Sequence, residues 1–284
     1  MKIKLIDLHS DLPTADGLNG NNLNIARQNA KSGIFTVNAI YKGNRSLPEG
    51  LEIAKEYADS RLPIAFEDGC YQDFLEEGSH LIDEQVEKLA YKLCSFNPLY
   101  ISLGWNYDNL LVGGCAQIGE LTKLGEIFIS CLNGNKVAVD VSHSNKKSFY
   151  QIVSRAKRVL CSHTAFEWIY PHRRNLDEMQ VKAILNKGGI IGLIGVGHFL
   201  SGIKNAKGRE EAFFNQLEGY VKKFGINGLA IGSDFYGSDA PVFADGDYTF
   251  VKKLTRVLQK KGMKSGDVER ILHTNARLFF NIKE

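Results

Sequence analysis

The stretch LIDLHSD, residues 5–11, joins an apolar run to two residue types that bind metals, and it decides how the rest of the chain is interpreted. Residues 5–8 have the composition of a buried β-strand, and His9 and Asp11 stand at its end. Residues two apart on a strand point to the same face, so both side chains can approach one metal ion. Taken alone, however, an H-x-D segment is more typical of a polar strand end, here beside a turn at Pro13.

The same arrangement, an apolar run followed by a residue type that binds metals, recurs later in the chain. Glu67 follows PIAF, His143 follows VAVDVS and His163 follows VLCS. A single histidine at a strand end is usually a structural or solvated residue, but two apolar runs that both end in Ser-His are less expected by chance. Neighbouring parallel strands lie about 4.8 Å apart, so both imidazoles can reach one ion. Asp68 competes with Glu67, but strand alternation turns it to the other face.

Eight apolar runs predict β-strands, and segments of helical periodicity lie between them. This alternation predicts a parallel sheet. Eight strands in 284 residues favour a closed (β/α)₈ TIM barrel over an open doubly wound sheet, which is the alternative. No Pro-rich, Ser-rich or low-complexity stretch divides the chain, so we expect one domain, residues 1–284. The predicted strands are Ile3–Leu8, Ile34–Ile40, Leu62–Phe66, Tyr100–Leu103, Lys136–Val141, Arg158–Cys161, Gly189–Ile194 and Leu229–Ile231.

The helical segments are bounded by residues that commonly start or stop a helix. Ser144 and Ser265 are predicted N-caps, and Gly225 is a predicted helix stop. Residues 16–29, which contain several Gly and Asn, are predicted to form a loop at the active site after the first strand. The predicted helices lie near residues 51–58, 82–93, 121–132, 149–156, 176–185, 210–224 and 248–258, and a last one follows residue 265.

The composition is that of an ordinary globular protein, and it argues against several classes of function. The formal net charge of +3 is too small, and the basic residues are too scattered, to indicate nucleic acid or a membrane surface as a partner. No apolar run approaches the ~20 residues that span a bilayer. The N-terminal segment is interrupted by charge too soon to resemble a signal peptide. Five cysteines without a C-x-x-C spacing predict free, buried thiols, so we expect a cytoplasmic protein.

Asp234, in the segment IGSDF, ends the eighth predicted strand, where a carboxylate can take a proton from a metal-bound water. The other histidines have less specific contexts. His80 and His273 are predicted surface or packing residues, whereas His172 and His198 are placed where they could also contact a substrate. The glycines of GGIIGLIGVG match neither phosphate-loop pattern, so tight packing inside the barrel explains them better.

Several segments together resemble the membrane (renal-type) dipeptidases, peptidase family M19 of the amidohydrolase superfamily. They are, in that family's order, LIDLHSDLP, FEDG, LGWN, DVSHSN, SHTAFEWIYPHRRNLDE and IGSDFYG, followed by TNARLF near the C-terminus. Each segment is weak evidence alone, but the set is specific and extends over nearly the whole chain. The resemblance implies a (β/α)₈ barrel, often a homodimer, that binds two zinc ions. It also implies small peptides as substrates: dipeptides, often with a D-residue at the C-terminal position.

The resemblance implies that five residues hold the two metals. His9 and Asp11 match ligands of the first ion, and His143 and His163 match ligands of the second. Glu67 matches the carboxylate that bridges them. A hydroxide between two Zn²⁺ ions is the expected nucleophile, because a bound metal lowers the pKa of water to about 7. Mn²⁺ or Co²⁺ would accept the same ligands.

The resemblance implies roles toward the substrate as well. Arg174 matches the arginine that holds the substrate's terminal carboxylate, and Asp234 matches the aspartate that handles the proton. Two residues depart from the family's pattern. Trp105 stands in LGWN where animal members carry a substrate-facing histidine, and Tyr236 replaces a common aspartate. Both changes leave the expected metal ligands intact and bear on the choice of substrate more than on the reaction.

Three alternative hypotheses fit parts of the same pattern. The first is a metal hydrolase of this fold that acts on another amide or on a lactone. The second is a barrel without catalysis that binds a small molecule or a partner. Trp105 supports this second hypothesis, whereas the intact ligands and Asp234 argue against it. The third, a phosphate-binding isomerase, would not need five clustered metal ligands.

Overall fold

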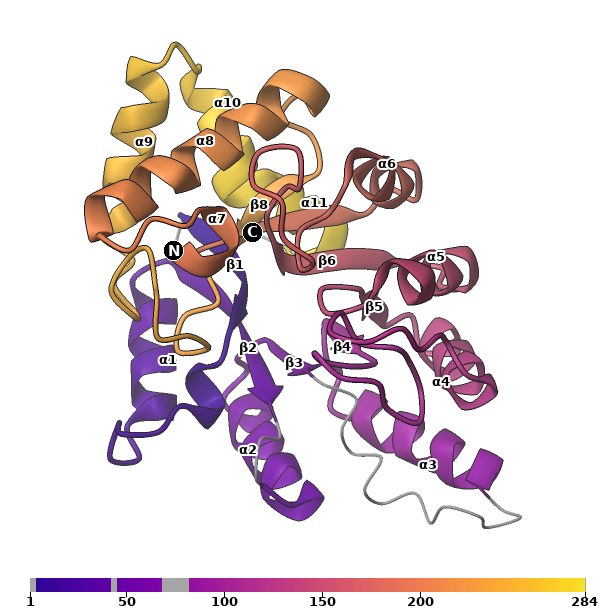
Figure 1. Cartoon of the computed structure of the whole chain (residues 1–284). Helices are drawn as coiled ribbons and strands as arrows, with labels where there is room; N and C mark the ends of the chain where they lie inside the picture. The colour runs from indigo at the N-terminus through magenta and orange to yellow at the C-terminus, as the bar shows by residue number, and fades with distance from the viewer. Residues whose placement is uncertain (1–3, 42–44, 68–81, 284) are drawn as a thin grey trace.

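Eight parallel strands close into a barrel in chain order, β1 to β8, with helices around it (Figure 1). The computed structural model describes residues 4–41, 45–67 and 82–283. All eight predicted strands are confirmed, with ends that differ by a few residues, and so is the (β/α)₈ TIM barrel. The strands are β1 (Leu5–Ser10), β2 (Ile34–Tyr41), β3 (Ile64–Glu67), β4 (Tyr100–Ser102), β5 (Ala138–Asp140), β6 (Val159–Thr164), β7 (Ile190–Ile194) and β8 (Leu229–Gly232).

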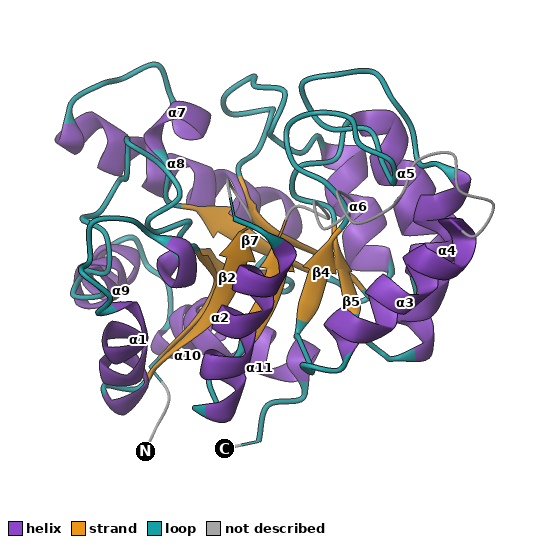
Figure 2. Cartoon of the chain, turned by 90° about the horizontal axis from the view of Figure 1, so that it is seen from below, coloured by secondary structure: helices purple, strands orange, loops and turns teal. Residues whose placement is uncertain are grey.

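Helices cover the outside of the barrel, and most of them connect one strand to the next (Figure 2). A 3₁₀ turn, Leu12–Thr14, follows β1, and a π-helical turn, Arg270–Thr274, interrupts the last helical segment. The helices are α1 (Asn22–Lys31), α2 (Leu47–Asp59), α3 (Ile82–Cys94), α4 (Lys123–Gly134), α5 (Lys146–Arg155), α6 (Glu178–Asn186), α7 (Gly197–Leu200), α8 (Ala206–Phe224), α9 (Phe250–Lys260), α10 (Ser265–Glu269) and α11 (Asn275–Phe280).

The prediction of a loop over residues 16–29 is wrong from Asn22 onward, because α1 begins there. Ala26 is the only residue of this helix that is buried. Three of its ten residues are asparagine, which has a low helix propensity and favours turns, so the sequence resembles a loop. The segment before Asn22 is irregular, and Asp16 in it lines the pocket described below.

The predicted helix boundaries need two corrections. Asn145, not Ser144, is the N-cap of α5, and its side chain accepts a hydrogen bond from a backbone N–H of the first turn. Ser265 is the first residue of α10 and not its cap, which is Lys264. Gly225 ends α8 with a φ of 75°, as predicted from the freedom of glycine in that region.

An apolar cluster fills the barrel interior and leaves the carboxyl ends of the strands to polar residues. Ile6 and Leu8 of β1 belong to it, and Ala276 and Phe280 of α11 pack against the same cluster. Arg158, just before β6, donates a hydrogen bond to the Phe279 carbonyl oxygen, which places α11 at the amino ends of the strands. The polar strand ends therefore open toward the opposite side.

Two glycines confirm the tight packing predicted inside the barrel. A Cβ atom on either Gly192 or Gly232 would lie 1.9 Å from the carbonyl oxygen of Ser162, far inside van der Waals contact. The cysteines in the described part of the chain are free and buried, as predicted, whereas Cys70, Asp68 and His80 lie outside the described residues. Over the described ranges, every helix is either too short or too polar to cross a membrane.

Candidate metal centre

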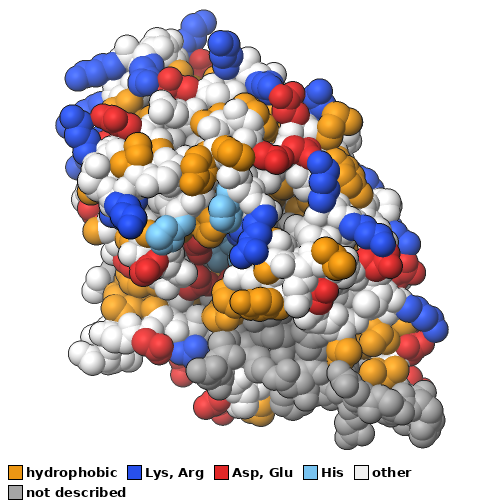
Figure 3. All heavy atoms as spheres, in the orientation of Figure 1, with side chains coloured by type: hydrophobic (Ala, Val, Ile, Leu, Met, Phe, Trp, Pro, Cys, Tyr) orange, Lys and Arg blue, Asp and Glu red, His pale blue; other side chains and the backbone are white. Residues whose placement is uncertain are grey.

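A pocket of about 730 Å³ opens at the carboxyl ends of the strands, where active sites of this fold are located. Histidine, acidic and basic side chains gather around the hollow on this face (Figure 3). His9 lies beneath the pocket and is fully buried. The other predicted site residues all line the pocket: Asp11, Glu67, Trp105, His143, His163, Arg174 and Asp234. The structure thus brings the predicted residues together from six different strands or the loops that follow them.

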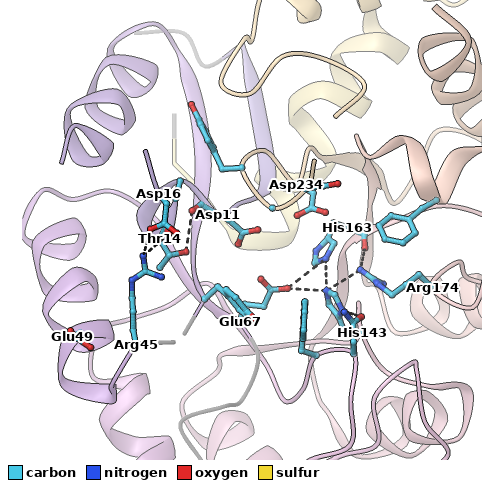
Figure 4. A pocket seen from close by; sticks show the side chains of 18 residues that line it. Asp11, Thr14, Asp16, Arg45, Glu49, Glu67, His143, His163, Arg174 and Asp234 are labelled. Atoms are coloured by element: carbon cyan, nitrogen blue, oxygen red, sulfur yellow. Dashed lines mark hydrogen bonds and ion pairs between the residues drawn. The ribbon is translucent and has the colours of Figure 1, made fainter. Parts of the chain in front are cut away.

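Glu67 ends β3, and its carboxylate points toward His143 and His163 (Figure 4). Its Oε2 is 3.3 Å from His9 Nε2. Its Oε1 is 3.1 Å from His143 Nε2 and 3.8 Å from His163 Nε2. The two carboxylate oxygens therefore face different histidines, which is the arrangement needed to bridge two cations.

His9 also faces two further carboxylates. Its Nε2 lies 3.5 Å from Asp11 Oδ1 and 3.8 Å from Asp234 Oδ1. Both His9 Nε2 and Asp11 Oδ1 are buried, yet neither makes a hydrogen bond to the described residues. Buried polar atoms are rarely left without partners, and imidazole nitrogens and carboxylate oxygens suit divalent cations such as Zn²⁺. These donor atoms therefore fit a metal site.

The Nδ1 atoms of His9, His143 and His163 each contact a hydrogen-bonding group of the protein. The Tyr100 hydroxyl donates its hydrogen to the Leu8 carbonyl oxygen at 2.9 Å, so toward His9 it can only accept. With Nδ1 protonated and a metal bound, each Nε2 would direct its lone pair toward the ion. The Nδ1 partners are the Tyr100 hydroxyl for His9 (2.7 Å), Asn106 Oδ1 for His143 (3.2 Å) and Ser162 Oγ for His163 (2.8 Å).

The two imidazoles on the other side of Glu67 approach each other closely. His143 Nε2 and His163 Nε2 lie 2.9 Å apart. Two lone pairs at this distance repel unless a proton or a cation lies between them. Burial lowers the pKa of His143 to about 4, with the charge of Arg174 adding to the effect, so a proton there is disfavoured at neutral pH. A metal ion would resolve the repulsion.

Burial also disfavours the charges of the acids. It raises the pKa of Asp11 to about 6, and the neighbouring Glu67 adds to this shift. It raises the pKa of Asp234 well above its usual range, with Asp11 contributing. Burial acts on Glu67 in the same direction, but the imidazoles of His9 and His143 outweigh it and hold the pKa of Glu67 well below its usual range. Crowded carboxylates of this kind are stabilised by a bound cation.

Asp234 follows β8 in an uncommon backbone conformation. Its φ is 58°, and that of Tyr236 is 68°, both in the left-handed region that residues other than glycine seldom adopt. Hydrogen bonds to β1 hold the segment: Asp234 N–H donates to the His9 carbonyl oxygen (3.1 Å), and Asp11 N–H donates to the Phe235 carbonyl oxygen (2.9 Å). Strain held in this way is common at functional sites, and here it directs a carboxylate into the pocket.

Arg174 lines the pocket beside His143, and it is only 5% exposed. Its guanidinium donates to the carbonyl oxygens of Ser142 and His163, and its Nη2 lies 3.2 Å from His143 Nε2. Its Nε has no hydrogen-bond partner within the described part of the chain. The side chain is thus fixed beside the proposed metal ligands with donor capacity left over.

Trp105 is half-buried on the pocket wall. Its ring centroid lies 6.1 Å from that of His143 and 5.5 Å from that of Tyr41. Tyr41 ends β2 and Asn106 follows Trp105, and both line the pocket. The strand-end position that indicates the other site residues would have identified these two as well. Phe199 and Arg45, which also line it, carry no comparable signal in the sequence.

Three other described histidines, His172, His198 and His273, are not among the residues that line the pocket. His198 is exposed, and its Nε2 is 3.1 Å from Asp239 Oδ1. His172 Nδ1 accepts a hydrogen bond from the Arg174 backbone N–H (3.2 Å). His273 is buried, which confirms it as a packing residue.

The model of the family described as membrane dipeptidase (peptidase family M19) matches residues 36–282. An uncharacterized protein in the pqqA 5' region of Klebsiella pneumoniae is 28% identical over 162 residues, 55% of this chain and 58% of that protein. Dipeptidase tcpJ of Claviceps purpurea is 24% identical over 230 residues, 77% of this chain and 52% of that protein. The chain thus spans little more than half the length of these relatives.

A solved structure shares the fold. It is a metallopeptidase from Rhodobacter sphaeroides, liganded with a phosphinate mimic of the dipeptide L-Ala-D-Ala. The TM-score is 0.79 at 18% identity, over 99% of both chains. Identity this low supports the fold alone, but the family match extends over most of the sequence. The chain therefore belongs to the membrane dipeptidase family, peptidase family M19.

Proposed function

We propose that this chain is a metal-dependent dipeptidase that binds two divalent cations, which we assign as Zn²⁺. The observation that carries the proposal is the position of Glu67, whose two oxygens face His9 on one side and His143 on the other. His9 and Asp11 would hold one ion, His143 and His163 the other, and Glu67 both. The family match supports a peptide as substrate.

The chain's own residues provide the remaining parts of a hydrolytic site. When bound, the metal ions would lower the pKa of a water molecule and polarise the scissile carbonyl group. Asp234 lies on the His9 side of the cluster, where its carboxylate would accept a proton and return it to the leaving amine. Its raised pKa suits a group that must both take and release a proton. Trp105 would form one wall for the substrate.

Arg174 would hold the terminal carboxylate of the dipeptide. We expect Arg174→Lys to lower kcat/KM for dipeptides by about 10- to 100-fold, mainly through KM, as for one lost charge-assisted hydrogen bond. Lysine keeps the charge but lacks the planar, two-pronged geometry that matches a carboxylate. Steady-state kinetics measures this, and Arg173→Lys is the matched control, since the Arg173 side chain is exposed. Equal activity of Arg174→Lys and the wild type would contradict the role.

Metal affinity should fall as the pH is lowered through about 6. Below its pKa of about 6, Asp11 holds a proton that the metal must displace. Each displaced proton costs about tenfold in affinity per pH unit. Above this pKa Asp11 is ionised and its contribution to the pH dependence ends. Zinc competition with a chromogenic chelator between about pH 5 and 8 measures the effect, and a constant affinity below pH 6 would argue against Asp11 as a ligand.

The stereochemistry of the substrate is a further part of the proposal. We include dipeptides with a C-terminal D-residue, because the similar Rhodobacter sphaeroides structure holds a mimic of L-Ala-D-Ala. The decisive experiment is a panel of L,L and L,D dipeptides, other amides and lactones, assayed with and without added zinc. Metal content is measured on protein purified without chelators. Two ions per chain and dipeptide hydrolysis are expected. Activity confined to other amides or lactones, or no metal and no hydrolysis, would reject the proposal.

A further inference from the structure

Two buried aspartates, on strands at opposite sides of the barrel, hold a serine of the neighbouring strand in the same way. Asp7 on β1 accepts hydrogen bonds from the backbone N–H (2.8 Å) and the hydroxyl (2.6 Å) of Ser233, just after β8. Asp140 on β5 accepts them from the backbone N–H (2.8 Å) and the hydroxyl (2.6 Å) of Ser162 on β6. Neither aspartate lines the pocket. We call these contacts the Asp7 clamp and the Asp140 clamp.

Asp140 acts only as an acceptor. Besides Ser162, it receives the hydroxyl (2.7 Å) and the backbone N–H (3.2 Å) of Ser142. All four of these contacts come from donors, which is the environment of an ionised carboxylate. The hydroxyl hydrogens of Ser142 and Ser162 are therefore both directed at Asp140.

The Asp140 clamp, unlike the Asp7 clamp, reaches an imidazole through its serine. Ser162 Oγ lies 2.8 Å from His163 Nδ1. Ser162 has one hydroxyl hydrogen, and Asp140 takes it, so Oγ can only accept a hydrogen from His163. Nδ1 then carries the proton, and Nε2 keeps the lone pair that faces Glu67. Within the described residues, the hydroxyl of Ser233 contacts backbone groups and Asp7 and makes no hydrogen bond to an imidazole.

We infer that Asp140, acting through Ser162, is a positioning residue that fixes the tautomer of His163 for metal binding. The inference rests on the proposed function, because it takes His163 as a ligand. Histidines that bind metals commonly donate their second N–H to a carboxylate or a carbonyl group, and here a hydroxyl stands between the two. Without the Asp140 carboxylate the hydroxyl can turn and donate to Nδ1. Nε2 would then carry the proton and could not bind a metal.

The tautomer of His163 can be determined by ¹⁵N NMR of the metal-free protein with ¹⁵N-labelled histidine. We expect the Nδ1–H form of His163 in the wild type, and a signal from the Nε2–H form in Asp140→Asn and in Ser162→Ala. Ser142→Ala is the control, because it removes another buried hydroxyl that donates to Asp140 (2.7 Å). Ser142 Oγ lies 3.0 Å from Ser162 Oγ and accepts from the His163 backbone N–H (3.2 Å), but it does not contact His163 Nδ1. Ser142→Ala should leave the tautomer unchanged.

The same variants should differ in metal affinity. In a zinc titration against a competing chelator, Asp140→Asn and Ser162→Ala should bind about 10- to 100-fold more weakly than the wild type, while Ser142→Ala binds as the wild type does. Asp7→Asn removes the other clamp and controls for the loss of a buried carboxylate. Its metal-free protein should lose thermal stability, as Asp140→Asn does, yet keep the His163 tautomer. If Asp140→Asn does not fold, Ser162→Ala alone carries the test.

Two results would overturn the inference. One is a His163 tautomer that stays unchanged in Ser162→Ala and Asp140→Asn while zinc binds normally. The other is a Ser142→Ala variant that loses as much affinity as Ser162→Ala. A wild-type chain that binds no zinc would instead overturn the proposed function, and with it the role of Asp140 in metal binding, so the two failures are distinguishable.

Discussion

Replacing Glu67 with glutamine should lower kcat/KM for a dipeptide by about 10³-fold or more, and should leave at most one metal ion per chain. Glutamine has the same size, but one of its two terminal atoms is an NH₂ group that donates hydrogen bonds and repels a cation. The atoms facing His9 (3.3 Å) and His143 (3.1 Å) could then no longer both bind metal. Loss of one Lewis acid removes several kcal/mol of transition-state stabilisation, and each 1.36 kcal/mol is about tenfold in rate.

The measurement pairs steady-state kinetics with elemental analysis of the same preparation. Glu167→Gln is the control for the change of charge, since Glu167 is an exposed glutamate just beyond β6 and does not line the pocket. It should retain wild-type activity and metal content. A Glu67→Gln variant that keeps two ions and full activity would show that the carboxylate does not bridge metals, and the proposed centre would have to be abandoned.

Replacing Asp234 with asparagine should lower kcat by about 10²- to 10⁴-fold, the usual contribution of a general acid–base group. KM and metal content should change little, because the amide would keep the shape of the side chain while losing only its ability to carry a proton. The left-handed backbone at this position tolerates asparagine, which adopts such conformations more readily than most residues. A defect in folding is therefore not expected.

Asp239→Asn is the matched control for this second variant. Asp239 lies on the same loop and is exposed, paired with His198 outside the pocket lining. Its replacement should leave kcat unchanged. If Asp234→Asn instead loses metal as Glu67→Gln does, Asp234 is a ligand and not a proton carrier. The donor atoms of Asp234, Asp11 and His9 all lie within 4.8 Å of one another, so this outcome is geometrically open.

The barrel could be predicted from the sequence because its strands are buried on both faces. Runs such as Ile190–Ile194 are almost continuously apolar and bounded by glycine, and they stand out without any structure. Helix α1 was not recognised, because its three asparagines have a low helix propensity and favour turns. The predicted N-cap of α5 was one residue too early, because Ser144 and Asn145 are both residue types that commonly cap a helix.

The site could be predicted because parallel strands place every carboxyl end on the same rim. The groups that hydrogen-bond to the imidazoles could not be predicted. Tyr100, for example, is 91 residues from His9 in the sequence, and only the closed barrel brings the two into contact. Asp7 and Asp140 carried an unused signal. Asp7 stands between Ile6 and Leu8, and Asp140 stands between Val139 and Val141. A buried charge among apolar residues is seldom left without partners.

Gly192 and Gly232 limit how this protein can change. Both approach the Ser162 carbonyl oxygen too closely to admit even a methyl group. Since Ser162 is hydrogen-bonded to His163, a bulkier residue at either glycine would displace the strand that presents this histidine. Laboratory evolution toward new substrates should therefore leave the barrel strands untouched and randomise the rim instead, for example at Phe199 and Tyr236.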